Sequence, residues 1–190
     1  MPQFNGVIGL LDSRSFVTVW YWLVLVGMWS TTGRSVLGVP TEILGRARSD
    51  LRAGRGETMA VITLLDWLSL VLPRWRMGPR EGVVFLGVTS FGLTVLALMG
   101  FLFWLEMAQA LFLLLFPFWL LFWMRHALAR RLIPLIEDAQ EGRASPEETA
   151  TAAVRRMVRH RTWVLLLSML AVAVTALWGT LWSLLHPNGL

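Results

Sequence analysis

Long stretches with almost no charged residue dominate the pattern of hydrophobic and polar positions along this chain. They occupy residues 15–33, 82–100, 104–124 and 162–185. An α-helix needs about 20 apolar residues to cross about 30 Å of hydrocarbon. The pattern therefore predicts an all-α membrane protein with four transmembrane helices and short amphipathic cytoplasmic helices, in which residues 1–190 form a single membrane domain.

The second and third stretches lie so close together that the turn between them must be short. Pro79 followed by Glu81 is typical of a helix start, because proline suits the first helical position and a carboxylate suits the first turn. Gly100 is placed to cap that helix in the left-handed conformation, and Glu106 falls in the first turn of the next one. A single long bent helix would not fit a bilayer. We therefore expect two antiparallel helices.

A further apolar segment, residues 58–72, is too short to span a membrane. Thr63, Asp66 and Ser69 recur at every third position, so they lie toward one side of a helix, and apolar residues occupy the other side. This amphipathic pattern predicts a helix that is interfacial, re-entrant or packed against a partner, and it does not choose among these.

The two longer polar segments, 34–81 and 125–161, carry signals for short helices. Thr41 is a candidate N-cap. Ser145 followed by Pro146 and two glutamates is typical of a helix start, from which one helix is expected to run unbroken into the last span. The two segments are too short for an independent domain with a substantial core. We expect them to form a platform of short helices on the inner face of the membrane.

Basic residues are distributed unevenly along the chain. All 17 are arginine: Arg14 precedes the first span, eight lie in residues 34–81 and eight in residues 125–161. Because cytoplasmic loops carry an excess of basic residues, this distribution places both long segments in the cytoplasm and both termini on the opposite side. Topology and anionic lipid head groups account for the formal net charge of +5. Nucleic acid is therefore not expected as a partner.

Composition narrows the function classes further. The chain is 56% hydrophobic and only 15% charged, which excludes a disordered protein. It has no cysteine, which excludes a disulfide scaffold, a cysteine-ligated zinc or iron–sulfur site and a catalytic thiol. A dinucleotide-binding glycine motif, a phosphate-binding loop, HExxH and GxSxG are also missing. We therefore predict no enzyme activity, no catalytic residues and no metal site.

Three of the spans have faces of distinct chemistry. Small residues at steps of three and four let helices approach closely in lipid, so their faces are expected to contact helices of this chain or of a partner. These small residues are Gly87, Ser90, Thr94 and Ala97 in the second span, and Ser168, Ala171, Thr175 and Gly179 in the fourth. An aromatic face on the third span suits lipid, a partner helix, a quinone or a pigment. It consists of Phe112, Phe116, Trp119 and Trp123.

Four polar residues near the span ends are candidates for chemistry. Glu106 and Gln109 form a possible polar site at the outer end of the third span, where a carboxylate suggests an ion or proton role. His126 and His160 lie at the cytoplasmic ends of the third and fourth spans, at matched depth. Two such histidines are candidates to ligate haem b. Their interfacial, arginine-flanked setting argues against this, and no cofactor is predicted.

Two segments of the chain have a distinctive pattern, LLDSRSFVTVWYWLVLVGMWSTTGRSVLGVP (10–40) and EMAQALFLLLFP (106–117). The pattern resembles a group of small integral membrane proteins from alphaproteobacteria of the Rhodobacter–Roseobacter type. The resemblance implies a multi-pass protein of the bacterial inner membrane with periplasmic termini. Some members carry the label "component of SufBCD complex", which implies iron–sulfur assembly. A chain without cysteine has no thiolate to hold such a cluster.

These observations lead to three functional hypotheses. The first is a non-enzymatic accessory, assembly or structural subunit of a larger inner-membrane complex, respiratory or photosynthetic, with membrane lipids and other membrane subunits as partners. The second is a homo-oligomeric channel or transporter with Glu106 and Gln109 at its outer mouth. The third is a redox membrane subunit that binds haem b or a quinone near His126 and His160.

Overall fold

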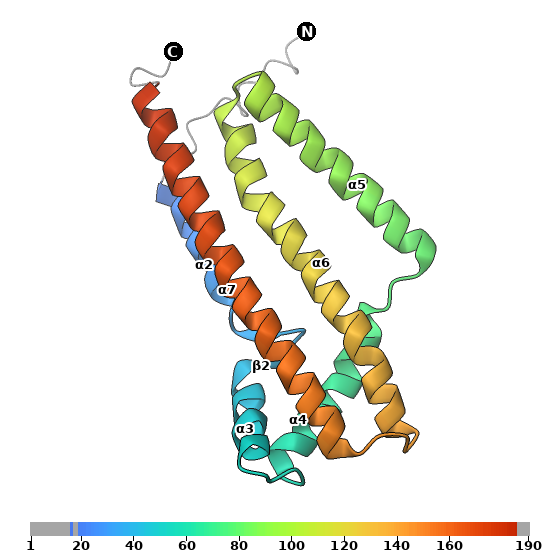
Figure 1. The fold of residues 1–190 in the computed structure, drawn as a ribbon. Helices are drawn as coiled ribbons and strands as arrows, with labels where there is room; N and C mark the ends of the chain where they lie inside the picture. Colours follow the sequence, from blue (N-terminus) through green and yellow to red (C-terminus); the bar gives the residue numbers. More distant parts are fainter. Residues whose placement is uncertain (1–15, 17–18, 186–190) are drawn as a thin grey trace. The chain divides into compact units, whose positions relative to one another are not determined.

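The computed structural model describes residue 16 and residues 19–185, and these are almost entirely helical (Figure 1). Contacts between residues divide the chain into two compact units. Unit 1 comprises residues 1–30, 79–120 and 166–190, and unit 2 comprises residues 31–78 and 121–165. The structure thus confirms an all-α protein, and it shows two units where the sequence suggested one domain.

Unit 1 consists of apolar helices. Its elements are most of α2 (Val19–Thr32), α5 (Pro79–Ala97), the π-helical turn η2 (Leu98–Leu102), the first part of α6 (Glu106–Gln140) and the last part of α7 (Pro146–Leu185). Three helical segments are long and apolar enough to cross a membrane: Pro79–Leu102, Glu106–Gln140 and Pro146–Leu185. The sequence predicted four spans. The described part of α2 has 14 residues, and residues 15, 17 and 18 of the predicted first span lie outside the described part of the chain.

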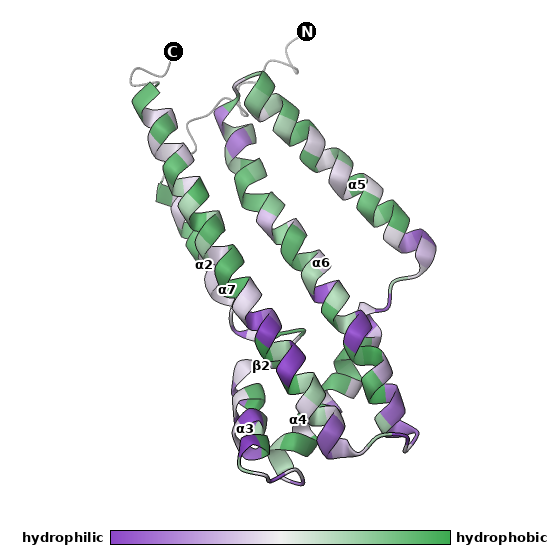
Figure 2. Ribbon diagram, viewed as in Figure 1, coloured by the Kyte–Doolittle hydropathy of each residue, from purple (hydrophilic) through white to green (hydrophobic). Residues whose placement is uncertain are grey.

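The division by contacts coincides with a division by charge. Among the described residues, the charged ones of unit 1 are Arg80, Glu81 and Glu106, and unit 2 carries all the others. Figure 2 shows the same change along α6 and α7, each of which is mostly hydrophobic over one part of its length and more hydrophilic over the other. The two units therefore have surfaces of different chemistry, one suited to hydrocarbon and one to water.

The turn between α5 and α6 differs from the predicted one. The left-handed cap predicted at Gly100 is wrong, because Gly100 lies within η2 and the residue with a positive φ is Trp104, at 59°. A Cβ atom at position 100 would lie 2.8 Å from the backbone nitrogen of Gln109. Glycine is therefore required here by the close approach of α6, and not by a left-handed backbone. The turn still separates two helices, as the sequence predicted.

Unit 2 contains the shorter elements. They are the hairpin of β1 (Ser35–Val36) and β2 (Val39–Pro40), then α3 (Thr41–Arg52), α4 (Met59–Val71) and the 3-10 turn η1 (Leu72–Trp75), together with the remaining parts of α6 and α7. The antiparallel hairpin pairs Val36 with Val39. Leu37 and Gly38 both have positive φ values, 55° and 90°, as a tight two-residue hairpin turn requires.

One buried core joins both polar segments of unit 2. Leu64 and Leu68 of α4, Leu132 of α6 and Met157 of α7 each have no exposed surface. The other buried residues of this core are Val36, Leu37, Val39, Leu44, Ala47, Val61, Leu72, Leu128, Ala129, Ile136, Ala150, Ala153 and Val154. The expectation of little core in these segments is wrong, because each supplies one amphipathic face and the core forms where several such faces meet.

The start of α7 matches its sequence signal, and the start of α3 does not. The Ser145 Oγ accepts a hydrogen bond from the backbone N–H of Glu148 at 3.2 Å, and α7 then runs unbroken to Leu185, which confirms that prediction. Thr41 is not the N-cap of α3, since that place is taken by Pro40 without a side-chain hydrogen bond. The Thr41 N–H instead donates to the Arg34 carbonyl at 3.3 Å, because the hairpin leads directly into the helix.

The sequence left three alternatives for residues 58–72: an interfacial helix, a re-entrant one or one packed against a partner. In the structure these residues form α4, and one face of α4 packs against other helices. Thr58 is its N-cap and accepts a hydrogen bond from the Val61 N–H at 3.4 Å. Val61 lies in the core of unit 2, whereas Met59 and Leu70 on the other side are 77% and 72% exposed. The helix therefore has a packed face and an exposed face that is partly apolar.

Candidate functional site

Glu106 is the buried carboxylate at the start of α6, with 6% of its surface exposed. Its Oε1 accepts a hydrogen bond from the backbone N–H of Phe16 at 2.8 Å. Its Oε2 accepts one from the indole N–H of Trp182 at 3.0 Å. Each carboxylate oxygen thus has a donor from a segment far away in the sequence. The side chain connects three parts of unit 1: the segment at Phe16, the start of α6 and the end of α7.

Gln109 lies one helical turn further and has no exposed surface. Its side-chain N–H group donates to the Gly100 carbonyl at 2.8 Å, and its side-chain oxygen accepts from the indole N–H of Trp178 at 2.9 Å. Residues one turn apart face the same side of a helix. Glu106 and Gln109 on α6 therefore pair with Trp182 and Trp178 on α7, one pair for each turn. We call the four side chains and the two residues that bond them through the backbone the outer cluster: Glu106, Gln109, Trp178 and Trp182, with the Phe16 N–H and the Gly100 carbonyl.

The small residues of α7 make room for this cluster. Gly179 is so close to Phe16 that a Cβ atom would lie 3.2 Å from the phenylalanine ring. Phe16 also meets the ring of Tyr21 edge-on, with 5.6 Å between centroids, and the Tyr21 hydroxyl donates to the Ala110 carbonyl at 3.3 Å. Thr175 of the same small face is buried. In this unit the small residues of α7 therefore face other parts of the same chain.

The outer cluster has the character of a structural connection. A buried polar group is costly unless it is hydrogen-bonded, and here the carboxylate and the amide each use both of their ends. An ion or proton pathway requires a group that exchanges partners with a passing ion or water. The Glu106 carboxylate instead has fixed donors from the backbone and from an indole. Its geometry favours holding the helices together.

The two histidines lie in unit 2 and have different surroundings. His126 stacks in parallel on Phe122 at 6.5 Å and meets Trp123 edge-on at 5.9 Å. His160 is 8% exposed, and its Nε2 has no hydrogen-bond partner among the described residues. His160 lines a groove in which His126 takes no part. This groove is therefore lined by only one of the two imidazoles that the haem hypothesis requires.

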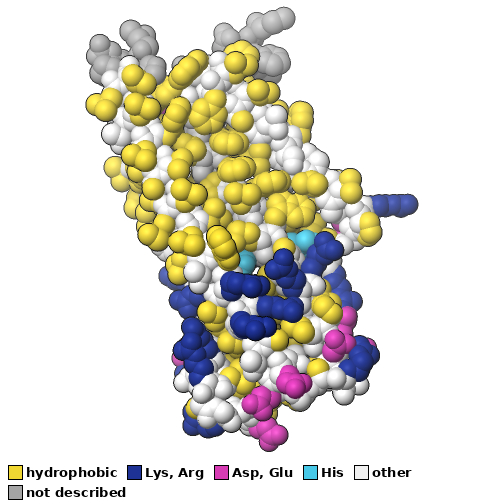
Figure 3. All heavy atoms as spheres, in the orientation of Figure 1, with side chains coloured by type: hydrophobic (Ala, Val, Ile, Leu, Met, Phe, Trp, Pro, Cys, Tyr) yellow, Lys and Arg dark blue, Asp and Glu magenta, His cyan; other side chains and the backbone are white. Residues whose placement is uncertain are grey.

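The groove beside His160 lies between the parts of α6 and α7 that belong to unit 2 and has a volume of about 480 Å³. Its polar lining comes from Arg131, Arg156, Arg159 and His160, and the three arginines give it positive charge. Its apolar lining comes from Met124, Ala127, Leu128 and Trp163. Figure 3 shows arginine side chains gathered next to histidine on the face in view. The arrangement suits an anion that carries an apolar part.

Burial and the positive charge of Arg125 lower the pKa of His160 from 6.5 to about 4. Arg131, Arg156 and Arg159 add further positive charge around the same groove. The imidazole is therefore neutral at pH 7. As a neutral ring it offers one N–H donor and one nitrogen acceptor, which makes it a hydrogen-bonding group and not a fourth cation.

We expect the folded protein to lose stability as the pH falls from 6.5 to about 4. The unfolded chain protonates His160 near pH 6.5 and the folded chain only near pH 4, so protons favour the unfolded state within that window. The full effect is about 3 kcal/mol at most. Thermal unfolding in detergent at stepped pH, compared between the wild type and His160→Gln, measures it. An identical pH dependence in both proteins would contradict the assignment.

The aromatic face of α6 meets other elements of the same chain. Phe112 and Phe116 stack at 5.3 Å, and Phe116 and Trp119 stack at 6.3 Å. The Trp119 indole N–H donates to the Thr89 hydroxyl of α5 at 3.0 Å, and Phe112 meets Phe101 of η2 edge-on. Trp123 belongs to unit 2 and contacts Phe122 and His126 instead. The face thus forms the side of α6 that contacts α5 and the turn.

The small residues of α5 are the least covered of the predicted faces. Gly87 and Thr94 are exposed, and Ser90 and Ala97 are half-buried. A Cβ atom at position 87 would meet nothing within 4 Å. Thr89, which accepts the hydrogen bond from Trp119, lies about 200° around the helix from Gly87. The small face of α5 therefore points away from α6.

Sequence reasoning singled out Glu106, Gln109 and His160 but missed the residues that surround them. A signal for the outer cluster was present: Trp178 and Trp182 lie one turn apart on α7, as Glu106 and Gln109 do on α6. The donor at Phe16 is a backbone N–H and left no signal. The groove was missed although Arg156, Arg159, His160 and Trp163 recur at helical spacing on one face of α7.

Comparisons with protein-family models, with curated proteins and with solved structures find no match to this chain, so the roles of its residues rest on its own sequence and geometry.

Proposed function

We propose that the chain is a non-enzymatic accessory or assembly subunit of a larger complex in a bacterial inner membrane. The observation that carries the proposal is the exposure of α5, none of whose residues is buried. Its apolar residues suit lipid, but its small face, centred on Gly87, also suits another helix, because small side chains allow the close contact that holds helices together in lipid. At Gly87, the centre of that face, a Cβ atom would meet none of the described residues within 4 Å.

The surroundings of Glu106 and of the two histidines also favour the subunit hypothesis over the channel and haem hypotheses. In the channel hypothesis Glu106 lines an ion path, whereas its carboxylate is buried and accepts hydrogen bonds from Phe16 and Trp182. In the haem hypothesis His126 and His160 share one site, whereas only His160 lines the groove. A subunit role requires neither arrangement. It requires a surface for a partner and a scaffold that holds that surface in place.

The proposed topology has four spans, with both termini in the periplasm and the arginine-rich unit 2 in the cytoplasm. The three long apolar helices and α2 supply the spans. The charge division between the units supports the orientation, because all arginines of the described chain except Arg80 fall in unit 2. The two compact units then match two solvents, lipid for unit 1 and water for unit 2.

Single-cysteine labelling tests this topology with little background, because the chain has no cysteine of its own. In intact cells, a membrane-impermeant maleimide is expected to label Asn188→Cys and to leave Gln140→Cys unlabelled until the membrane is opened. Gln140 ends α6 in unit 2 and is exposed. Labelling of Gln140→Cys in intact cells would contradict the orientation.

The subunit role is tested by purification in a mild detergent followed by native gel electrophoresis and mass spectrometry. We expect the wild-type chain to migrate with other membrane proteins, and Gly87→Leu to migrate alone, because the larger side chain keeps a neighbouring helix at a distance. Val88→Phe is the matched control, since it adds bulk to α5 at a position that is 66% exposed. Migration of the wild type as a lone monomer would overturn the proposal.

A further inference from the structure

The groove between α6 and α7 in unit 2 has a lining that changes from apolar to cationic along the helices. On α7 the order is Trp163, His160, Arg159 and Arg156, which covers two helical turns. Trp163 is 58% exposed, and α7 continues beyond it with Leu165, which is 53% exposed. A ligand that fits this groove must carry an anionic group next to an apolar part.

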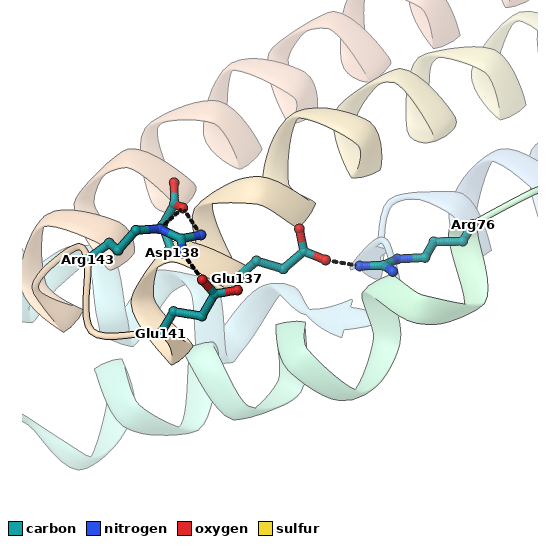
Figure 4. Close-up of polar contacts among 5 residues, drawn as sticks. All are labelled: Arg76, Glu137, Asp138, Glu141 and Arg143. Atoms are coloured by element: carbon teal, nitrogen blue, oxygen red, sulfur yellow. Dashed lines mark hydrogen bonds and ion pairs between the residues drawn. The ribbon is translucent and has the colours of Figure 1, made fainter.

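Four arginines elsewhere in unit 2 have acidic partners, whereas the arginines of the groove have none within the part of the chain that the structure describes. Arg143 pairs with Asp138 at 2.6 Å and also with Glu141, and Arg76 pairs with Glu137 (Figure 4). Arg46 and Arg55 also have carboxylate partners. Among the described residues, Arg131, Arg156 and Arg159 have no ion pair, and the groove has no acidic residue in its lining. The positive charge of the groove is therefore not neutralised by any acidic residue in the described part of the chain.

His160 supplies a second and independent observation. It lines the groove, is more than nine-tenths buried, and its Nε2 has no hydrogen-bond partner among the described residues. An unpaired buried polar atom is costly, so a ligand that offered it a hydrogen bond would relieve that cost. Phosphate oxygens and glycerol hydroxyl groups both provide such a bond.

We propose that this groove binds the head group of an anionic phospholipid, with the phosphate between Arg131, Arg156 and Arg159. Guanidinium groups bind phosphate through paired, charge-assisted hydrogen bonds. Arg156 is already oriented in this region, since one of its N–H groups donates to the Arg131 carbonyl. The acyl chains leave the groove past Trp163, in the direction in which α7 becomes apolar. Basic pockets between helices on the cytoplasmic side of a membrane are suited to this role.

The proposal is independent of any partner protein, so it is tested on the isolated full-length chain in detergent. Native mass spectrometry during titration with phosphatidylglycerol counts the bound lipids and gives their affinity. We expect phosphatidylglycerol to bind at least ten-fold more tightly than phosphatidylcholine. We also expect the double variant Arg156→Gln/Arg159→Gln to lose at least ten-fold in affinity for phosphatidylglycerol.

The matched control is Arg130→Gln/Arg161→Gln. It removes the same amount of charge, one arginine from α6 and one from α7, at exposed positions that do not line the groove. An equal loss of affinity in both double variants would overturn the proposal, because it would indicate attraction to the charged surface in general. Equal binding of the two lipids by the wild type would overturn it as well. The comparison of the two lipids uses only the wild-type protein, so it does not depend on how the variants fold.

A soluble anion is distinguished from a lipid with two further probes. Inorganic phosphate and glycerol 3-phosphate carry the phosphate but no acyl chain. We expect neither to raise the melting temperature of the protein at concentrations where phosphatidylglycerol does. A rise of the same size with either compound would show that the groove takes a soluble phosphate, and the lipid assignment would be wrong.

Discussion

Glu106→Ala is expected to lower the free energy of unfolding by about 3 to 5 kcal/mol, which is among the largest effects of a single substitution in this chain. The change removes the acceptor of two hydrogen bonds, from the Phe16 N–H and from the Trp182 indole, at a position that is 6% exposed. Each donor left buried without a partner costs about 1 to 3 kcal/mol. The hydrocarbon of lipid or detergent has no hydrogen bond to offer in place of the carboxylate.

Two further variants separate this loss from a general effect of removing a carboxylate. Glu106→Gln keeps one acceptor oxygen and is expected to fall between Glu106→Ala and the wild type. Glu81→Ala removes an exposed carboxylate from the first turn of α5 and is expected to cost less than about 1 kcal/mol. The measurement is unfolding by sodium dodecyl sulfate in mixed micelles, followed by circular dichroism. If Glu106→Ala unfolds at the same detergent fraction as Glu81→Ala, the outer cluster does not hold unit 1 together.

The same cluster also separates the channel hypothesis from the subunit hypothesis. A carboxylate at a channel mouth must be reached by ions, and its neutral variant should change flux and leave stability nearly unchanged. A carboxylate that connects helices should change stability first. The loss of stability in Glu106→Ala therefore tests function as well as structure. Its size indicates whether the carboxylate connects helices or is reached by ions.

The sequence predicted the helices better than it predicted their contacts. Charge-free windows located the three long apolar helices because the cost of burying charge in hydrocarbon applies to each residue separately. The start at Ser145 and Pro146 was also predictable, because capping is local. The turn at Gly100 was not, since it depends on the approach of Gln109 from the next helix. A local signal holds only where no other element takes part: Ser145 caps α7, whereas the hairpin leads directly into α3 and Thr41 is not its cap.

The candidate site was also predictable only where the signal lies in a single residue and not in a contact between elements. Glu106 was recognisable because a carboxylate is rare in an apolar stretch, and His160 because it lies at the end of one. Their roles were not recognisable, because the partners of Glu106 come from Phe16 and Trp182, and the charge near His160 comes from Arg125 on another helix. Arginine spacing alone also did not reveal which arginines pair with acids and which line the groove.

Unit 2 gives the second large prediction, because the sequence suggested a loose platform and the structure has a packed core. Leu132→Ala is expected to lower the free energy of unfolding by about 3 kcal/mol, since the substitution removes buried methyl groups and leaves a cavity in the core. Leu132 has no exposed surface and packs among residues of α4 and α7. Unfolding of the detergent-solubilised protein, followed by circular dichroism, measures the loss.

Leu70→Ala is the matched control, because it makes the same chemical change in the same unit at a position that is 72% exposed. Its expected cost is less than about 1 kcal/mol, since little apolar surface leaves a packed environment. Equal costs in the two variants would mean that the polar segments form separate short helices on the membrane surface. A larger cost at Leu132 would mean that they fold into a unit with its own core. Such a unit can hold Arg131, Arg156 and Arg159 in fixed positions around a bound phosphate, which loose helices cannot do.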